Sequence, residues 1–286
     1  MTMSTSASCP GDRIDQYRLG SLVSRTSEAS VFRATDTRTG TTVALKIPHE
    51  SHQKRGLFVS GGGSRIGGRL HHPTIARTLH EERATCPYTV LEWAEGRTLR
   101  AILDDKKRWP VDDTIHIALQ ICEALQYIHD QGFVHLDLKP ENLIVDSRRV
   151  VKLIDFGSAR KLRPGWLAFI PKKFSGTPDY AAPEQIRGKS VDARSDVYSM
   201  GLVLYEMLAG ELPFSGADSA LALQLRLESD PPPLCEIVPE ITPELSEAVK
   251  RATSRNPSKR QTTAQELALQ LKQSVEDAKY ELVGSV

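Results

Sequence analysis

The sequence lacks the long apolar run that a membrane-spanning helix requires. No stretch of about 18 consecutive apolar residues occurs among its 286 positions, so we expect no membrane segment in this chain. Met1–Gly11 is rich in Ser and Thr and has no apolar core of the kind found in secretory signal peptides. These two features together predict a cytoplasmic protein.

An excess of charge of one sign is also missing. The chain has 37 Lys and Arg against 36 Asp and Glu, which leaves a formal net charge of +1. The chain therefore has no overall basic field of the kind that would indicate nucleic acid or an anionic membrane as a partner. The 4 cysteines are widely spaced, without a Cys-x-x-Cys pair, and are Cys9, Cys86, Cys122 and Cys235. This pattern is typical of a reduced cytosolic protein, and the cysteines give no metal site.

The composition supports a folded chain with a strand-rich beginning. Hydrophobic residues make up 40% of the sequence and charged residues 26%, which is enough apolar material for a buried core in one large domain or two packed lobes. β-Branched residues and turn signals dominate from Tyr17 to about Ile47, with a hairpin connection expected in Thr35–Thr42 around Gly40. Tyr88–Trp93 predicts a further strand.

The rest of the chain has a helical pattern. Asp112 and Asp113 follow Pro110 and are expected to cap a helix that ends near Gly132. Apolar residues then recur at helical spacing, at Ile115, Leu119, Cys122, Leu125 and Ile128.

Two short strands are expected after that helix, at Leu143–Val145 and Val150–Ile154, and the pattern is mostly helical from Asp192 onward. Strands followed by helices, rather than alternating with them, predict an α+β fold with two lobes.

Four short segments carry the chemistry, and they occur in a specific order. The stretch His135–Asn142 reads His-Leu-Asp-Leu-Lys-Pro-Glu-Asn, and Asp155–Gly157, which reads Asp-Phe-Gly, begins 18 positions after Asp137. Gly176–Glu184 follows, and Val43–Lys46 lies far upstream. In this combination the chain resembles the eukaryotic-type (Hanks-type) protein kinases.

The resemblance covers about Ile14 to Leu271. Lys139, two places after Asp137, is similar to the Ser/Thr branch of the family, and the short loops resemble bacterial members most closely. The resemblance implies a bilobal fold, with a small antiparallel β-sheet N-lobe over residues 14–93 and a mainly helical C-lobe over residues 94–275. Residues 1–13 are expected to form a flexible N-terminal tail and residues 276–286 a C-terminal tail.

By resemblance, the activity is that of an ATP- and Mg²⁺-dependent protein serine/threonine kinase acting on protein substrates. Phosphoryl transfer depends mainly on positioning and on neutralised charge. The family pattern assigns Asp137 to the acceptor hydroxyl as base or orienting group and Lys139 to the transferring phosphate. It assigns Asn142 and Asp155 to Mg²⁺, a cation that prefers oxygen ligands.

The resemblance also implies a set of nucleotide-binding residues. Lys46 would pair with the α- and β-phosphates. On the same strand face, opposite the face shared by Val43, Leu45 and Ile47, Ala44 would pack against adenine. Leu91 would gate the adenine pocket, and the backbone from Glu92 to Ala94 would be the hinge. The complete expected set is Lys46, Ala44, Val31, Leu91, Glu92, Ala94 and Leu143.

Three further residues are expected to support the site without taking part in chemistry. Asp196 resembles a buried helix Asp that braces the catalytic loop, which by the resemblance is His135–Asn142. Arg260 resembles the partner of Glu184, and a partly buried pair of this type is structural.

The phosphate-covering loop departs from the family pattern. Alignment of Leu22-Val23 and Val31-Phe32 puts Ser24, Thr26 and Ala29 at the three positions where the family has glycine. Side chains at these positions hinder close approach of the backbone to a nucleotide, although Ser and Thr hydroxyls could bind phosphate themselves. We expect a displaced or mobile loop and weakened ATP affinity.

The helix that should orient Lys46 also departs from the pattern. Both usual spacings for its Glu fall on Gly63, and no Asp or Glu occurs between Ser51 and His80. The five glycines from Gly61 to Gly68 would cost a helix about 5 kcal/mol relative to alanine, so a short, distorted or absent helix is expected. Ser60–Ser64 has the composition of a flexible linker.

The third departure is His135-Leu136-Asp137, which lacks the Arg that commonly receives an activation-loop phosphate. No Ser, Thr or Tyr lies between Ala159 and Phe174, and the loop is basic instead. A phosphate switch of the usual type is not expected. The basic residues are either a solvated loop or a docking site for an acidic partner.

These departures leave two alternatives to an ordinary kinase. The chain could be a catalytically impaired pseudokinase that acts as a nucleotide-binding scaffold or allosteric partner. It could also use Arg25 as a relocated cation, in the manner of the with-no-lysine kinases. Because Lys46, Asp137, Lys139, Asn142 and Asp155 are all retained, an enzyme is favoured, with an activating protein partner or a dimer contact as a way to rebuild the broken helix.

Overall fold

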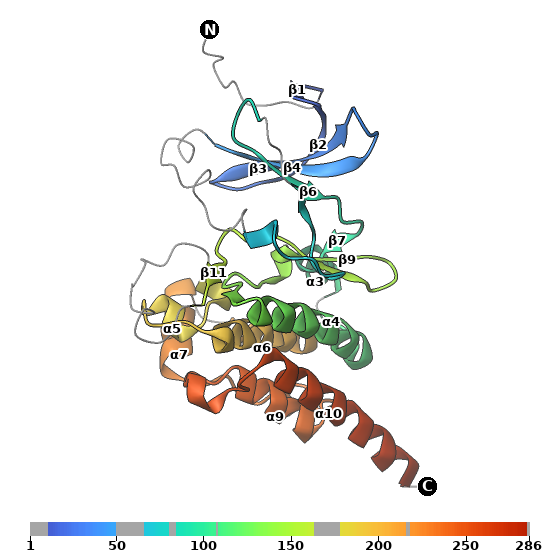
Figure 1. Cartoon of the computed structure of the whole chain (residues 1–286). Helices are drawn as coiled ribbons and strands as arrows, with labels where there is room; N and C mark the ends of the chain where they lie inside the picture. Colours follow the sequence, from blue (N-terminus) through green and yellow to red (C-terminus); the bar gives the residue numbers. More distant parts are fainter. Residues whose placement is uncertain are drawn as a thin grey trace. The chain divides into compact units, whose positions relative to one another are not determined.

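The computed structural model describes residues 11–49, 66–79, 84–106, 108–162, 178–215 and 218–284. The chain forms two compact units, a first unit from Met1 to Ala94 and a second unit from Glu95 to Val286 (Figure 1). The glycine-rich segment around Gly63 and most of the basic loop, residues 163–177, lie outside the described residues.

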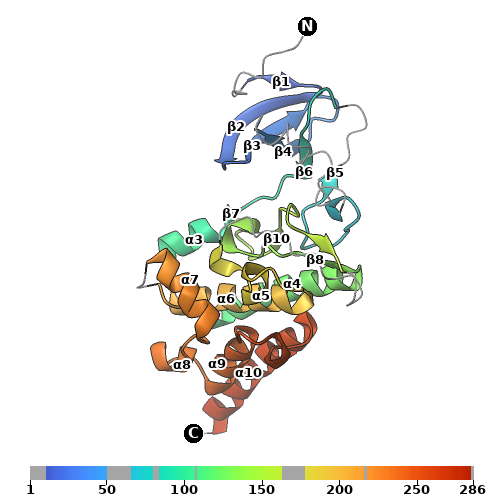
Figure 2. The ribbon, with the colours of Figure 1, turned by 90° about the vertical axis from the view of Figure 1, so that its left-hand side faces the viewer.

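The first unit contains an antiparallel sheet with the order β1-β2-β3-β4-β6-β5 (Figures 1 and 2). Its strands are β1 (Arg13–Ile14), β2 (Tyr17–Arg25), β3 (Ala29–Asp36), β4 (Thr42–Pro48), β5 (Thr78–Leu79) and β6 (Thr89–Glu92).

The hairpin expected around Gly40 is confirmed. Thr35 pairs with Thr42 across β3 and β4, and the N–H of Gly40 donates to the carbonyl of Asp36 at 2.8 Å. Gly40 has a φ of 74°, a left-handed conformation that glycine adopts without a Cβ penalty. The turn thus fixes the register of the strand that carries Lys46.

One face of this sheet forms the core of the first unit. Its buried residues alternate along the strands, as a period of two requires, and are Tyr17, Leu19, Phe32, Ala34, Val43, Leu45 and Val90. The expectation that Val43, Leu45 and Ile47 share a face is confirmed, since Ile47 packs against this cluster.

The second unit is mainly helical. Its longer helices are α3 (Leu99–Lys106), α4 (Val111–Asp130), α6 (Ala193–Ala209), α7 (Ser219–Glu228), α9 (Pro243–Ala252) and α10 (Ala264–Gly284). Its single-turn elements are η1 (Pro140–Asn142), η2 (Pro178–Tyr180), α5 (Pro183–Ile186), α8 (Leu234–Ile237) and η3 (Pro257–Lys259).

Short strands accompany these helices and hold the loops between them. β7 (Arg97–Thr98), β9 (Leu143–Val145) and β10 (Val151–Leu153) form a sheet in the order β10-β9-β7. β8 (Phe133–Val134) pairs with β11 (Arg160–Lys161). Both strands expected between Leu143 and Ile154 are therefore present.

Helix α6 is the centre of the second unit, and it contacts α4, α9 and α10 (Figure 1). The side chain of Asp192 accepts a hydrogen bond from the N–H of Arg194 and caps its N-terminus. Gly201 allows close packing, because a Cβ there would lie 2.8 Å from both Ala252 Cβ and Thr253 Cγ2. Such distances are shorter than real contacts, so α6 approaches α9 only with glycine at this position.

One sequence expectation about α4 is wrong. The helix begins at Val111 with Pro110 as its N-cap, and no side chain caps it. Asp112 and Asp113 lie in the first turn instead. The proline conformation already directs the chain into the helix, and the two carboxylates act through the helix dipole.

The described part of the chain contains no helix of the length and apolarity that crossing a bilayer demands.

Candidate active site

The loop between β8 and β9 brings three of the predicted site residues together. Lys139 Nζ donates to Asp137 Oδ1 at 3.0 Å. Asn142 Nδ2 donates to Asp137 Oδ2 at 3.0 Å and to the Asp137 backbone carbonyl at 2.7 Å. Both carboxylate oxygens of Asp137 therefore accept a hydrogen bond, and the side chain is held in one orientation.

Asp155 is placed beside this cluster by the pairing of β9 and β10. Leu153 lies opposite Leu143, and the N–H of Ile154 donates to the carbonyl of Asn142 at 2.9 Å. Asp155 is the next residue and has a φ of 63°, and its Oδ1 accepts from the N–H of Gly157 at 3.1 Å. Left-handed backbone at a non-glycine residue costs energy and is concentrated at functional sites.

Asp196 braces the catalytic loop from α6, as expected. Its Oδ2 accepts from the N–H of His135 and from His129 Nε2, and its Oδ1 accepts from the N–H of Leu136, all at 2.8 Å. Leu136 has a φ of 63°, so the carboxylate holds a turn that the backbone does not favour by itself.

The environment of Asp196 also favours its charged form. Burial opposes ionisation of the carboxyl, since the residue is fully buried. The hydrogen bonds from His129 and from the N–H of Leu136 outweigh this cost and hold the pKa of Asp196 below its ordinary value.

We expect Asp196→Asn to lower the free energy of unfolding at pH 7 by about 2–4 kcal/mol, because it removes the buried charge and replaces one of the two oxygens that together accept three hydrogen bonds by an NH2 donor. A lowered folded-state pKa stabilises the protein above the ordinary pKa of 3.8, and this stabilisation is lost as the pH falls through the folded-state pKa. The difference between wild type and variant should therefore shrink below about pH 4.

Urea denaturation followed by circular dichroism over this pH range measures the difference. The matched control is Asp218→Asn at the N-cap of α7, where Asn caps as well as Asp. A stability difference between D196N and wild type that is independent of pH would contradict the assignment.

His135 connects the catalytic loop to the Asp-Phe-Gly segment. Its Nδ1 accepts from the N–H of Asp137 at 3.3 Å. Its ring packs edge-on against Phe156, with 5.0 Å between the ring centroids and an interplanar angle of 71°. Both side chains are buried, so the positions of Asp137 and Asp155 are coupled through an apolar contact.

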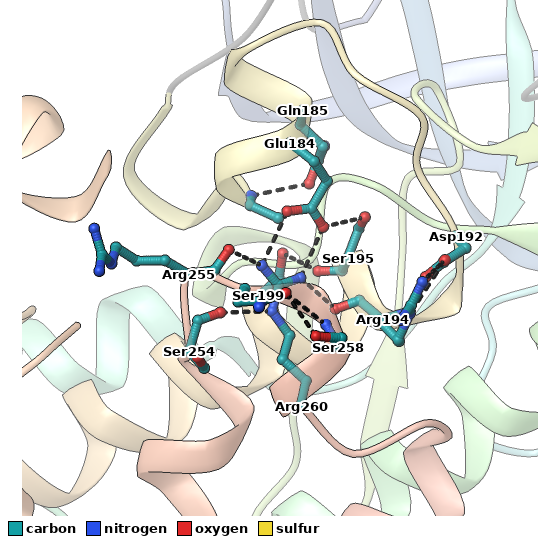
Figure 3. A network of polar contacts seen from close by, with 12 residues as sticks. Glu184, Gln185, Asp192, Arg194, Ser195, Ser199, Ser254, Arg255, Ser258 and Arg260 are labelled. Carbon is teal, nitrogen blue, oxygen red and sulfur yellow. Dashed lines mark hydrogen bonds and ion pairs between the residues drawn. The ribbon is translucent and has the colours of Figure 1, made fainter. Parts of the chain in front are cut away.

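Glu184 and Arg260 form the buried pair that the sequence predicts (Figure 3). Arg260 Nη1 and Nη2 reach Glu184 Oε1 and Oε2 at 2.7 and 2.9 Å. The remaining N–H groups of Arg260 donate to the backbone carbonyls of Ser254, Arg194 and Arg255. All five guanidinium donors are thus used, and Figure 3 shows the Arg260 side chain with its contacts to Glu184 and to the neighbouring backbone.

Comparison with known proteins identifies the family to which the chain belongs. A model of the protein kinase domain matches residues 17–271 of the chain. The chain belongs to the protein kinase family. The α+β fold, with an antiparallel sheet in the first unit and helices in the second, is the fold of that family.

The chain is similar to several bacterial proteins that are named serine/threonine-protein kinases. The chain is 33% identical over 232 residues to the probable serine/threonine-protein kinase PknB of Corynebacterium glutamicum, covering 78% of this chain and 36% of the relative. It is 34% identical over 226 residues to PknB of Mycobacterium leprae, with 77% and 36% covered. For the probable PknB of Bifidobacterium longum the identity is 36% over 221 residues, with 73% and 32% covered. The chain spans about a third of the length of these curated relatives.

In the first unit, the strand register places the expected nucleotide-binding side chains of this kinase-family chain on one face. Val31 lies opposite Lys46, and Ala44 lies opposite Leu91. Residues directly opposite each other in antiparallel strands project to the same side, as do alternate residues of one strand. All four side chains therefore share the face of the sheet that the apolar core does not use.

Of the other three nucleotide-binding candidates, two lie at the ends of strands and Ala94 lies in the connection between β6 and β7. Glu92 ends β6, and its carboxylate accepts from the N–H of Arg77 at 3.0 Å. Ala94 is buried and is the last residue of the first unit. Leu143 belongs to the second unit, where it is fully buried next to Asn142 at the start of β9.

A network that the sequence analysis missed involves Tyr180, Glu206 and Arg100. The hydroxyl of Tyr180 donates to Glu206 Oε2, and Arg100 Nη2 donates to Glu206 Oε1 at 2.6 Å. Burial and the Glu206 carboxylate raise the pKa of Tyr180, so the hydroxyl stays protonated and remains a donor. The network connects η2 and α3 to α6. A signal was present in the sequence, since Glu206 is the one charged residue within the apolar stretch Leu202–Leu208.

A second missed contact holds the catalytic loop from α5. Gln185 Nε2 donates to the carbonyl of Leu136 at 3.0 Å, and its Oε1 accepts from the N–H of Ala182 at 3.0 Å. One amide side chain thus satisfies both a loop carbonyl and a helix N-terminal N–H.

Proposed function

We propose that the chain catalyses transfer of the γ-phosphate of ATP to Ser or Thr hydroxyls of protein substrates, with Mg²⁺ as cofactor. The observation that supports it best is the cluster of Asp137, Lys139 and Asn142, with Asp155 next to it along a paired strand. In the proposed roles these residues supply a base, a cation and two metal-binding side chains, which is what phosphoryl transfer requires.

Asp137 takes the part of base or orienting group. The acceptor oxygen forms a bond to the γ-phosphorus, the bond from that phosphorus to the bridging oxygen breaks, and ADP leaves with the bonding electrons. The hydroxyl proton passes to the Asp137 carboxylate. Lys139, 3.0 Å from Asp137, carries the positive charge that stabilises the transferring phosphoryl group.

Asn142 and Asp155 fit a magnesium ion. Asn142 Nδ2 is bonded to Asp137, so Oδ1 is the atom it can offer to a cation, and Asp155 supplies a carboxylate. The described residues contain no cluster of three or more His, Cys, Asp and Glu that would hold a metal alone. Mg²⁺ takes few protein ligands and uses nucleotide phosphates and water for the rest. When bound, the ion neutralises phosphate charge.

In the first unit, Lys46 binds the phosphates and the apolar side chains of Val31, Ala44 and Leu91 contact adenine. Their common sheet face supports this assignment. The pseudokinase alternative is not favoured, because a scaffold needs no base, yet Asp137 keeps both of its hydrogen-bond partners.

We expect Lys46→Met to reduce kcat/KM for ATP by about tenfold to a hundredfold, since it removes one charge-assisted contact to phosphate. Transfer of radiolabel from ATP to a generic protein substrate measures the loss, and Lys189→Met, at an exposed lysine of the second unit, is the matched control.

Melting temperature with and without saturating Mg²⁺·ATP separates the two functions. Wild-type protein that is stabilised by Mg²⁺·ATP but transfers no label would be a nucleotide-binding scaffold, and the proposed activity would be wrong. K46M with wild-type kcat/KM would exclude Lys46 from the site.

A further inference from the structure

The connection between β2 and β3 is held by hydrogen bonds between its own backbone and one side-chain hydroxyl, that of Thr26. The N–H groups of Glu28 and Ala29 both donate to Thr26 Oγ1, each at 3.2 Å. The N–H of Thr26 donates to the carbonyl of Ala29 at 2.9 Å, and the Thr26 hydroxyl donates to the same carbonyl at 3.2 Å. Two consecutive backbone donors at the tip of this loop are thus occupied by the side chain of Thr26.

The carbonyl side of the same loop is held by His49. The N–H of His49 donates to the carbonyl of Glu28 at 2.8 Å, and His49 Nδ1 lies 3.2 Å from the carbonyl of Ser27. A carbonyl only accepts, so Nδ1 carries the proton and Nε2 accepts from the hydroxyl of Ser30 at 3.0 Å.

These contacts fix the orientation of two peptide groups. In a trans peptide the C=O and the N–H point in opposite directions. The carbonyls of Ser27 and Glu28 contact His49, while the N–H groups that follow them, of Glu28 and Ala29, contact Thr26. Each peptide is held at both ends, so neither N–H can turn toward a ligand without breaking its bond to Thr26.

This loop is the one that, by family membership, covers the phosphates of ATP, and backbone N–H groups in such loops are the donors that bind phosphate oxygens. Thr26 occupies the second of the three positions where the family has glycine. A glycine there offers no hydroxyl, so the two N–H groups would have no internal acceptor of this kind.

We propose that the hydroxyl of Thr26 competes with the nucleotide phosphates for the N–H groups of Glu28 and Ala29. The free protein holds its phosphate-covering loop in a self-bonded form, and ATP binds only at the cost of these bonds. Thr26 therefore weakens nucleotide binding indirectly, because its hydroxyl occupies the loop N–H groups that would otherwise bind phosphate. This inference rests on the proposed function, because it needs ATP as the ligand.

The test compares Thr26→Val with Thr26→Ser by isothermal titration calorimetry of the full chain. Valine keeps the β-branched shape and removes the hydroxyl, and serine keeps the hydroxyl. We expect T26V to bind a Mg²⁺-loaded, non-hydrolysable ATP analogue about three- to tenfold more tightly than wild type, which corresponds to about one released hydrogen bond. T26S should match wild type, and adenosine, which has no phosphates, should bind all three proteins equally.

Thr39→Val is the matched control for the loss of a threonine hydroxyl. Thr39 Oγ1 accepts from the N–H of Thr41 at 3.2 Å in the β3–β4 turn of the same sheet. We expect it to leave affinity for the analogue unchanged. If T26V binds the analogue as weakly as wild type or more weakly, the hydroxyl does not compete with phosphate, and the inference is overturned. A gain that extends equally to adenosine overturns it as well.

Amide hydrogen exchange tests the loop without any nucleotide. In the free wild-type protein the amides of Glu28 and Ala29 should be protected, and in T26V their exchange should speed up while that of Thr41 stays unchanged. Rapid exchange of both amides in free wild type would overturn the inference even if ATP binds. Protected amides in a protein that binds no ATP would instead show that the proposed function fails and that the inference fails with it.

Discussion

Asparagine in place of Asp137 is expected to reduce the rate of phosphate transfer by about 10²- to 10⁴-fold, the usual contribution of a positioned general base. The variant keeps the shape of the side chain and loses its charge. Lys139 and Asn142 contact different oxygens of the carboxylate, and the amide of asparagine presents an NH2 group in place of one of them, so one of the two hydrogen bonds is lost in this geometry. Asn142 keeps its bond to the backbone carbonyl of residue 137, which preserves the loop.

Initial rates of label transfer from ATP at saturating Mg²⁺ measure the effect, and calorimetry with the ATP analogue shows whether binding is retained. Asp112→Asn, at an exposed position in the first turn of α4, is the matched control. A D137N protein whose rate is within a factor of about three of wild type would mean that residue 137 is not the base.

Methionine in place of Arg260 is expected to lower the free energy of unfolding by about 3–5 kcal/mol, the cost of leaving one member of a buried ion pair without its partner. Glu184 would then be a buried carboxylate whose remaining partner is the hydroxyl of Ser195 at 2.7 Å. Three backbone carbonyls would lose a donor as well. The contact of the guanidinium with the Tyr198 ring, 4.7 Å from its centroid, would also be lost.

Urea denaturation monitored by helical circular dichroism reports this change. Arg255→Met, which removes a more exposed arginine beside the same network, should cost at most about 1 kcal/mol. The double variant Glu184→Leu/Arg260→Met should recover part of the loss, because it removes both charges at once. An R260M variant as stable as R255M would show that the pair contributes nothing to folding.

Several features of the site were predictable because they are local in the chain. Asp137, Lys139 and Asn142 lie within six positions, and one loop with one helical turn suffices to bring them together. The hairpin around Gly40 and the alternation in β4 depend on backbone conformation and on side-chain period, which a sequence shows directly.

Some other features depend on residues that are distant in sequence or on the path of a preceding loop, and among these several were missed or predicted wrongly. Tyr180, Glu206 and Arg100 come from three elements, and nothing in their spacing indicates a common hydrogen-bond network. The cap of α4 was assigned to carboxylates, whereas Pro110 takes that position, because the helix start depends on where the preceding loop directs the chain. The loss of glycine from the phosphate-covering loop was visible, but not that Thr26 and His49 would bond to its backbone.

The sequence by itself determined the family, the strand and helix periods, and the chemical groups available for phosphoryl transfer. These features depend on the types of the residues and on their spacing over short distances along the chain, and both are the same in every conformation. Only the tertiary structure decided which donor meets which acceptor, such as Asp196 with two loop N–H groups 60 and 61 positions away. A hydrogen bond needs its atoms within about 3 Å, and packing of the whole unit, not local sequence, brings such groups that close.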